Sequence, residues 1–245
     1  MARFNVAALV QPAGAPKTNP CSACAVRQMT VCAVLDDDDQ RRLASIMTQQ
    51  QLAEGRTIFS EADPAEYVFN VTSGAVKVYK LLPDGRRQIT GFLFPGDFLG
   101  LTHNELYAYT AEALMPITVC RFSRRRLEAL LDEFPTLERR LLGMASHELA
   151  AAQDQMVLLG RKTARERLIS FLLNLSRAQE RHGLQDNPVD LPMGRADIAD
   201  YLGLTIETVS RTFTQLKKDG LIQLLEGGAV RLVKTESLQS EADGL

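Results

Sequence analysis

The sequence predicts an α+β protein in which a β-roll is followed by a long helix and a C-terminal winged helix-turn-helix. Three observations support this: short apolar segments between turn residues fill positions 57–122, a helical pattern runs through 124–159, and two short helices flank Gly203. We therefore expect an arm, a cysteine loop with the β-roll, a dimerisation helix, a winged helix-turn-helix and a tail. Their predicted ranges are 1–20, 21–123, 124–160, 161–235 and 236–245.

Composition limits the range of functions. The chain has 245 residues, 45% of them hydrophobic, and no apolar stretch long enough to span a membrane. Its first residues, MARFNVAALVQPAGAPK, lack the apolar core of a secretory leader, so we expect a soluble cytoplasmic protein. The formal net charge is only -2, so any nucleic-acid surface must be local. Without a Gly-rich phosphate loop or a nucleophile motif, an enzyme is not expected.

Four cysteines give the sharpest chemical signal. Cys21, Cys24 and Cys32 are spaced C-x2-C-x7-C, and Cys120 lies far along the chain. A C-x2-C pair puts two thiolates within reach of one metal centre, and a third on the same loop can join them. Cys120 completes a four-thiolate set if the fold brings it back. This ligand set suits an iron-sulfur cluster or zinc.

Other interpretations of the cysteines carry less weight. Disulfides are disfavoured because a cytosolic chain keeps its thiols reduced. Cys21 and Cys24 do not follow a strand in a βαβ pattern, as a thioredoxin-like dithiol would. Taken alone, Cys120 is typical of a buried core cysteine on a strand, so its assignment as a ligand depends on the other three.

The segments before and within the predicted roll are also informative. Residues 36–50 begin with an Asp run, followed by Leu43, Ile46 and Met47 at helical spacing, which predicts a helix with an acidic N-terminus. In the roll, Val76, Val78 and Tyr79 together with Lys77 and Lys80 indicate a half-exposed strand. The strands are expected in TIFSEAD, YVFNVTSG, AVKVYKLLPDG, RRQITGFLFPGD and ITVCRF. Regular strands and Gly turns predict an antiparallel barrel or roll.

The helical stretch from about Arg124 to Leu159 carries an apolar seam. Spacings of three and four residues are typical of a coiled coil, and the small Ala side chains allow close approach. The seam residues are Leu142, Ala145, Leu149, Ala152, Met156 and Leu159. Packing on the roll is one explanation, but a self-complementary seam favours a homodimer with twofold symmetry.

The C-terminal third predicts a helix-turn-helix with a wing. A first helix covers Arg195 to Leu202, Gly203 supplies the turn, and Thr205 caps a second helix that runs to about Asp219. The following segment, LIQLLEGGAVRLV, predicts a hairpin that turns at its Gly pair. Before these elements, ARERLISFLLNLSRAQE predicts an amphipathic helix with Leu168, Phe171, Leu172 and Leu175 inward.

The outward face of the second helix suits DNA. Val209, Phe213 and Leu216 form its apolar face. Arg can donate two hydrogen bonds to guanine, Glu can accept from cytosine, and Ser can serve either role. We therefore predict that bases are read by Glu207, Ser210 and Arg211, although Glu207 and Arg211 are also spaced for a surface ion pair. The predicted backbone contacts are Thr205, Thr208, Lys217 and Lys218.

Together, the cysteine loop, the roll, the long helix and the ETVSR segment resemble the Crp-Fnr superfamily of bacterial transcription regulators over about residues 20–235. The cysteine spacing is similar to that of the Fnr-type oxygen sensors, including the FnrN and FnrL groups. This resemblance implies a cyclic-nucleotide-binding-like roll as the sensor domain. It also implies a 4Fe-4S cluster on Cys21, Cys24, Cys32 and Cys120, which stays intact without oxygen and permits dimerisation and DNA binding.

The resemblance implies further properties of the function. Glu207, Ser210 and Arg211 would read a TTGAT-like half-site in an inverted repeat of double-stranded DNA. Cyclic-nucleotide binders carry Gly-Glu-Leu and an Arg-Ser pair, whereas GDFLGLTHNELYAYTAEAL has no Arg, so cAMP binding is not expected. The PDGRR turn at 83–87 would contact RNA polymerase, or else is a solvated turn. A structural four-cysteine zinc site without oxygen sensing remains the alternative.

Overall fold

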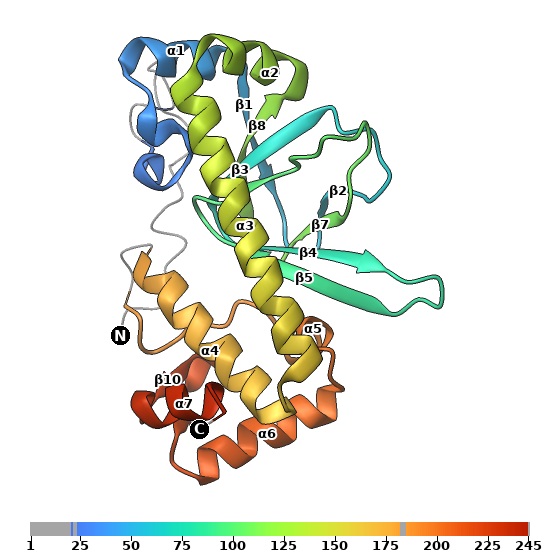
Figure 1. The fold of residues 1–245 in the computed structure, drawn as a ribbon, viewed down its shortest axis with the longest axis vertical. Helices are drawn as coiled ribbons and strands as arrows, with labels where there is room; N and C mark the ends of the chain where they lie inside the picture. Colours follow the sequence, from blue (N-terminus) through green and yellow to red (C-terminus); the bar gives the residue numbers. More distant parts are fainter. Residues whose placement is uncertain (1–20, 22–23, 182–184, 245) are drawn as a thin grey trace. The chain divides into compact units, whose positions relative to one another are not determined.

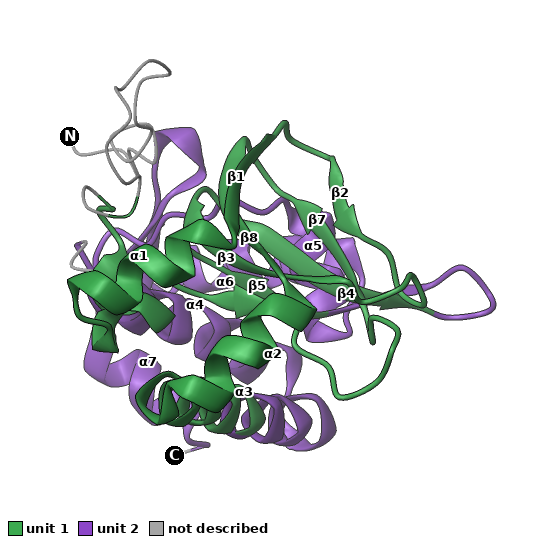
Figure 2. Cartoon of the chain, turned by 90° about the horizontal axis from the view of Figure 1, so that it is seen from above, with its two compact units in different colours: residues 1–81, 90–149 green, residues 82–89, 150–245 purple. Residues whose placement is uncertain are grey.

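The computed structural model describes residue 21 and residues 24–181 and 185–244. It contains two compact units, residues 1–81 with 90–149 and residues 82–89 with 150–245, which Figure 2 colours separately. The arm predicted at 1–20 lies outside the described residues. Within the described part, no helix has the length and apolar character needed to cross a membrane.

Two four-stranded sheets form the predicted β-roll (Figure 1), with strand orders β1-β8-β3-β6 and β2-β7-β4-β5. The pairs β1/β8, β3/β8, β3/β6, β2/β7 and β4/β7 are antiparallel, as expected. The strands are β1 (Met47–Leu52), β2 (Thr57–Phe59), β3 (Tyr67–Ser73), β4 (Val76–Leu81), β5 (Arg87–Leu93), β6 (Phe98–Leu99), β7 (Thr110–Ala113) and β8 (Ile117–Ser123).

One lysine of the roll departs from the predicted pattern. Lys80 is exposed as expected, but Lys77 on β4 is buried. Its Nζ lies 3.1 Å from Oε1 of Glu112, its ladder partner on β7, and the Tyr79 hydroxyl donates to the same carboxylate at 3.2 Å. A buried cation needs such a partner, which comes from a distant strand and so does not show in the local alternation.

The acidic run caps a helix as predicted, but the helix is shorter than expected. The Asp36 side chain accepts hydrogen bonds from the backbone N–H groups of Asp38 and Asp39, at the start of α1 (Asp37–Ser45). Met47 does not extend this helix. It begins β1, where it pairs with Phe122 of β8, because the hydrogen bonds of the sheet outweigh the local helical pattern.

The stretch expected as one helix from Arg124 forms two helices, α2 (Arg124–Glu133) and α3 (Pro135–Arg161). Phe134 between them has φ -120° and ψ 81°, outside the helical region. A proline disfavours helical conformation in the residue before it and is itself well suited to the first position of a helix. Pro135 therefore ends one helix and starts the next.

The second unit contains the winged helix-turn-helix (Figure 1). Its elements are α4 (Ala164–Arg181), α5 (Arg195–Leu202), α6 (Ile206–Lys218), β9 (Ile222–Leu224), the 3-10 turn Glu226–Gly228, β10 (Val230–Leu232) and α7 (Thr235–Ala242). The inward residues predicted for α4 are buried. Residues 236–245, expected as a tail, instead contribute most of α7, which packs against α4 and buries Leu238.

The buried ion pair of the roll leads to a stability prediction. Lys77→Met should lower the free energy of unfolding by about 3 kcal/mol, because it leaves the Glu112 carboxylate without its cation. The double variant Lys77→Met/Glu112→Gln should recover most of that loss. Urea unfolding measures both. Lys80→Met is the matched control, since its exposed pair with Glu61 is worth at most about 1 kcal/mol. Equal losses in the two single variants would contradict the prediction.

Candidate metal centre and nucleic-acid interface

The cysteine loop is folded by a succession of tight turns. The Cys24 N–H lies 3.4 Å from the Cys21 carbonyl, and two 3-10 turns follow, at Arg27–Met29 and Val31–Val34. Thr30 joins these turns, since its hydroxyl donates to the Arg27 carbonyl and accepts from the Cys32 N–H. This local hydrogen bonding keeps the three loop cysteines on one short, compact segment.

The fourth cysteine lies on β8, between β1 and β3. Cys120 is half-buried, with Gln49 and Asn70 as its neighbours across the ladder. Cys32 and Cys120 pack against the same apolar core. The roll therefore brings Cys120 back towards the N-terminal loop, as the ligand assignment requires.

The thiols influence one another electrostatically. Burial raises the pKa of Cys120 to about 12, and Cys24, Cys21 and Cys32 add to the rise. Burial likewise raises the pKa of Cys21 to about 11, with further increases from Cys32 and Cys24 and a decrease from Arg27. No disulfide joins any of these four cysteines, all of which lie in the described part of the chain. Among the described residues, no three His, Cys, Asp or Glu side chains are arranged as an ion site.

Arg27 gives the loop a cation beside these sulfurs. Its Nη2 donates to the Leu35 carbonyl at 2.9 Å, and its charge acts on both Cys21 and Cys32. Its buried Nε has no acceptor among the described residues. A buried N–H group without an acceptor suits an additional anionic group at this place, and a negatively charged thiolate-bound cluster would be such a group.

The cysteine loop is packed against the first turns of α3. Val31 and Leu35 share a core with Leu137 and Leu141, together with residues of β8 and α2. Arg140 of α3 also donates to the Met29 carbonyl at 3.3 Å. Rearrangement of the loop would therefore disturb the packing at the start of α3.

The predicted seam of α3 is largely uncovered. Leu142, Leu149 and Met156 are 67%, 60% and 70% exposed, and Ala145 and Ala152 are exposed too. Leu159 is half-buried. Val157, which the heptad-like spacing did not include, is also exposed, at 57%. Such a stripe of large apolar side chains on one helix is typical of an interaction surface.

The helix-turn-helix has the predicted local geometry. Gly203 adopts φ 62° and ψ 42° at the end of α5, a left-handed conformation that favours glycine. The Thr205 hydroxyl caps α6 by accepting from the Thr208 N–H at 3.2 Å. Thr205 and Thr208 also share a hydrogen bond between their hydroxyls, so both predicted backbone contacts help to shape the start of α6.

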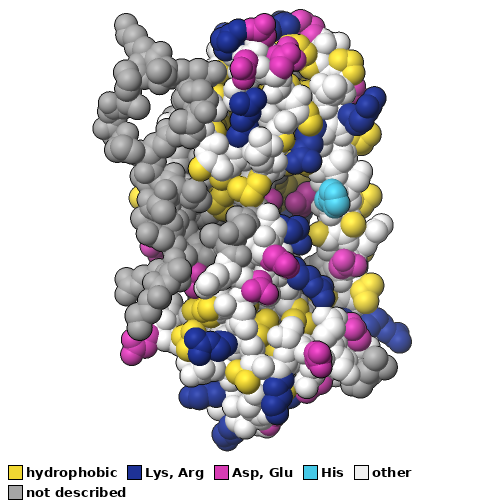
Figure 3. All heavy atoms as spheres, turned by 90° about the vertical axis from the view of Figure 1, so that its left-hand side faces the viewer, with side chains coloured by type: hydrophobic (Ala, Val, Ile, Leu, Met, Phe, Trp, Pro, Cys, Tyr) yellow, Lys and Arg dark blue, Asp and Glu magenta, His cyan; other side chains and the backbone are white. Residues whose placement is uncertain are grey.

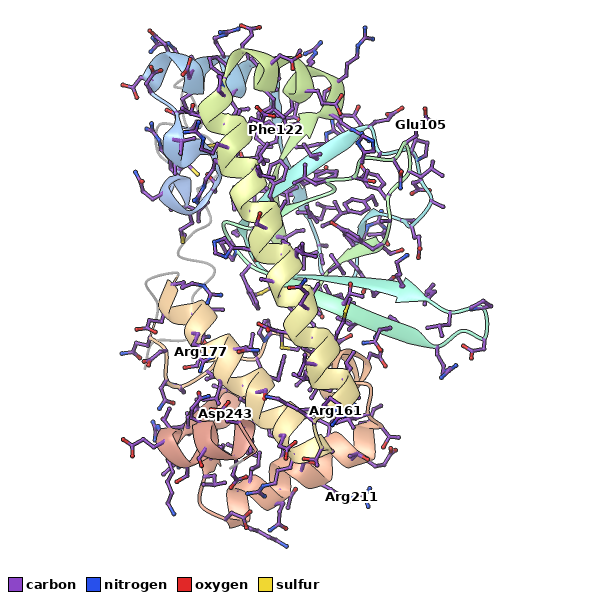
Figure 4. All side chains as sticks on the ribbon, in the orientation of Figure 1. Glu105, Phe122, Arg161, Arg177, Arg211 and Asp243 are labelled. Atoms are coloured by element: carbon purple, nitrogen blue, oxygen red, sulfur yellow. The ribbon has the colours of Figure 1, made fainter. Side chains whose placement is uncertain are left out.

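The two faces of α6 are divided as predicted. Val209, Phe213 and Leu216 are buried. The exposed residues include every predicted base-reading residue and both lysines, namely Glu207, Ser210, Arg211, Lys217 and Lys218. The Arg211 side chain lies on the outer side of α6 (Figure 4) and donates to the Thr208 hydroxyl at 3.5 Å.

The Glu207 carboxyl interacts with neighbouring groups at the start of α6. The backbone N–H of Glu207 and the Thr205 hydroxyl lower the pKa of the Glu207 carboxyl, and Arg211 adds to the decrease. Glu207 is therefore ionised and can act only as an acceptor.

On the face shown in Figure 3, cations and anions are interspersed among the coloured residues, in keeping with the net charge of -2.

One residue that orients the helix-turn-helix was not predicted. Arg167 on α4 donates to three carbonyls: Nε to Lys162, Nη1 to Leu202 and Nη2 to Leu159, at 2.9, 2.9 and 2.8 Å. Leu159 lies in the last turn of α3 and Leu202 ends α5. A cation is favourable at helix C-termini, and here one guanidinium serves two. Nothing in the sequence separates it from the other arginines of α4.

Comparison with known proteins matches both units. Residues 49–134 match the cyclic nucleotide-binding domain family, and residues 166–241 match the Crp-like helix-turn-helix domain family. The chain is 45% identical over 214 residues to nitrogen fixation regulation protein FixK of Bradyrhizobium diazoefficiens, covering 87% of this chain and 90% of the relative. It is 38% identical over 208 residues to transcriptional activator protein FnrL of Cereibacter sphaeroides, covering 83% and 84%.

The structure of FixK2 from Bradyrhizobium japonicum is similar to this one, with a TM-score of 0.75 at 40% sequence identity. The match covers 80% of this chain and 96% of that chain. CooA from Carboxydothermus hydrogenoformans, solved as a mutant, has a TM-score of 0.66 at 22% identity, which shows a shared fold.

The predicted base contact Arg211 and the predicted phosphate contact Lys217 are both exposed on α6 and can be distinguished by experiment. Arg211→Ala should weaken binding to the preferred duplex by about 1–3 kcal/mol and relax the preference at one base pair. Lys217→Ala should weaken binding to all duplexes about equally and reduce the slope of log affinity against log salt by about one. Titrations at several salt concentrations check both. If Arg211→Ala changed the salt slope and left the preference intact, Arg211 would be a phosphate contact.

Proposed function

The chain belongs to the Crp-Fnr family of DNA-binding transcription regulators, and on that premise we propose that it is an oxygen-responsive activator that binds DNA as a homodimer. One observation carries the proposal: the cysteine loop, the strand that bears Cys120 and the first turns of α3 share one core. Relatives named transcriptional activators, FnrL, FnrA of Stutzerimonas stutzeri and anr of Pseudomonas aeruginosa, support the activating role.

In this proposal Cys21, Cys24, Cys32 and Cys120 hold a 4Fe-4S cluster. When bound, such a cluster supplies iron–thiolate and iron–sulfide bonding that molecular oxygen can destroy. The chain contributes four thiols on two segments, one of them the loop and the other β8. Arg27 contributes a buried N–H donor and a positive charge beside Cys21 and Cys32, which offsets negative charge on the thiolates.

The loop controls the dimer through the core that it shares with α3. With all four thiolates engaged, Val31 and Leu35 are held against Leu137 and Leu141. Release of the thiolates would loosen the loop and remove packing from the first turns of α3. The equilibrium between dimer and monomer then shifts towards monomer, since each state is favoured by a different loop packing.

Dimerisation determines occupancy of the DNA. The exposed stripe on α3 offers Leu142, Leu149 and Met156 to the partner, with alanines between them that permit close approach. A dimer places two α6 helices on the two halves of an inverted TTGAT-like repeat, with Glu207, Ser210 and Arg211 reading each half. A monomer loses one half-site and with it several kcal/mol of binding free energy.

Two further parts of the proposal concern ligands and partners. Residues 49–134 share the cyclic nucleotide-binding fold, but residues 96–114 supply no Arg to hold a cyclic phosphate, so we propose no response to cAMP. The turn at 83–87, which is exposed from 83 to 86 and half-buried at Arg87, is proposed to contact RNA polymerase. Within it, Arg86 pairs with Asp84, and Arg87 pairs with Asp197 and Asp200.

Metal analysis and DNA binding on one sample test the oxygen response. Protein purified without oxygen should be brown, carry about four iron atoms and labile sulfide per chain, and bind the inverted repeat. After exposure to air, the same sample should lose iron and bind at least tenfold more weakly. Colourless protein with one zinc per chain, and equal DNA binding in air, would instead support the structural zinc site.

Cys120→Ala tests the ligand that depends on the roll. The variant should fail to assemble the four-iron cluster, because the loop supplies only three thiolates. Equal unfolding midpoints for the metal-free variant and metal-free wild type would show that the roll is intact. A Cys120→Ala protein that holds a full cluster would break the assignment.

Leu149→Glu tests the dimer surface. A carboxylate in an apolar seam should raise the dimer dissociation constant at least tenfold, because it must lose its water on association. Light scattering under anaerobic conditions measures the mass. Leu81→Glu is the matched control, since Leu81 is also 60% exposed but lies at the end of β4. If both variants stayed dimeric, another surface would form the dimer.

A further inference from the structure

Arg165, on the first turn of α4, forms ion pairs with residues at the ends of two later helices, α6 and α7. Its Nη1 lies 2.6 Å from Oδ2 of Asp219, which ends α6. Its Nε and Nη2 lie 2.7 and 3.2 Å from the two carboxylate oxygens of Glu241 on α7. The guanidinium is thus bidentate towards one helix and bonded to a second, a geometry that a lysine cannot reproduce.

Both carboxylates stand where a negative charge is unfavourable. Asp219 is the C-cap of α6, and Glu241 lies in the last turn of α7, so each adds to the negative end of a helix dipole. Arg165 compensates both. These charges change one another's ionisation. Glu241 and Asp219 raise the pKa of Arg165, and Arg165 lowers the pKa of Asp219.

Helix α7 is fixed to α4 by further contacts (Figure 1). Leu238 and Ala242 are buried. Lys162 donates to the Ala242 carbonyl at 2.8 Å and to the Ser170 hydroxyl at 2.9 Å. Arg177 of α4, labelled in Figure 4, donates to Gln239 of α7 at 2.6 Å. These contacts fix the position of α7, and with it the position of the Glu241 carboxylate that binds Arg165.

The recognition helix α6 is held at both ends by different means. The Thr205 cap fixes its N-terminus, where the base-reading residues lie. At its C-terminus, the Gln215 side chain donates to Oδ1 of Asp219 while Arg165 binds the other oxygen. These pairs are about one-third exposed, so their contribution to stability is small, but they define one orientation of the helix axis.

We propose that Arg165 is a positioning residue for DNA recognition, holding the C-terminal end of α6 through Asp219 and against α7 through Glu241. None of these three residues lies on the base-reading face. The helix that presents Glu207, Ser210 and Arg211 is aimed by contacts at its far end, and the last helix of the chain takes part in DNA recognition without touching a base. This role concerns DNA binding and is independent of the proposed response to oxygen.

The test uses the full-length protein and the duplex that the wild type selects from a randomised pool. Arg165→Gln should bind this duplex about tenfold more weakly, while its affinity for a scrambled duplex and its salt slope stay unchanged. Arg161→Gln is the matched control, because it removes the same charge from an exposed residue four positions earlier. Asp219→Asn should have the same effect as Arg165→Gln, and the double variant should be no worse than either.

Three results would overturn the proposal. A salt slope reduced by about one, with equal losses on both duplexes, would make Arg165 a direct phosphate contact. A loss confined to the fraction of protein active in a stoichiometric titration, with unchanged affinity of that fraction, would make its role purely structural. A loss no greater than that of Arg161→Gln, or additive losses in the double variant, would show that the bridge to Asp219 does not position α6.

Discussion

One of the two apolar cores of the first unit joins elements from both ends of that unit. The cysteine loop, α1, β8, α2 and the first turns of α3 each contribute side chains to it, and no one of these elements could bury its apolar face alone. Because protein interiors are close-packed, they respond to a displaced element by shifting to another packing rather than by deforming gradually. A change at the loop can therefore reach α3 through side-chain packing and through the hydrogen bond from Arg140 to the Met29 carbonyl.

Local chemistry made several features predictable from sequence. The Asp36 cap, the turn at Gly203 and the Thr205 cap each depend on residues within three or four positions, so the sequence contains the whole cause. The split of α6 into a buried and an exposed face follows from its helical period. Pro135 by itself indicates a helix boundary, but the apolar spacing continues through it and therefore predicted a single helix.

Other features arise from partners far away in the chain. Met47 is drawn into a strand by β8, and Lys77 is buried because Glu112 faces it across the ladder. Helix α7 forms against α4, where a short polar segment would otherwise remain a tail. Proximity of Cys120 to the cysteine loop belongs to the same class. Spacing predicted Cys21, Cys24 and Cys32 as ligands, whereas the prediction for Cys120 depends on the folded roll.

Arg167 holds the junction of α3, α4 and α5 by binding three carbonyls. This determines which substitutions the junction tolerates. The acceptors belong to the backbone, so Leu159, Lys162 and Leu202 can be replaced by many residues without removing them. Arg167 is the one side chain that these three hydrogen bonds require. The junction thus tolerates drift at three positions while depending on one, and its geometry can be kept across relatives whose neighbouring residues have diverged.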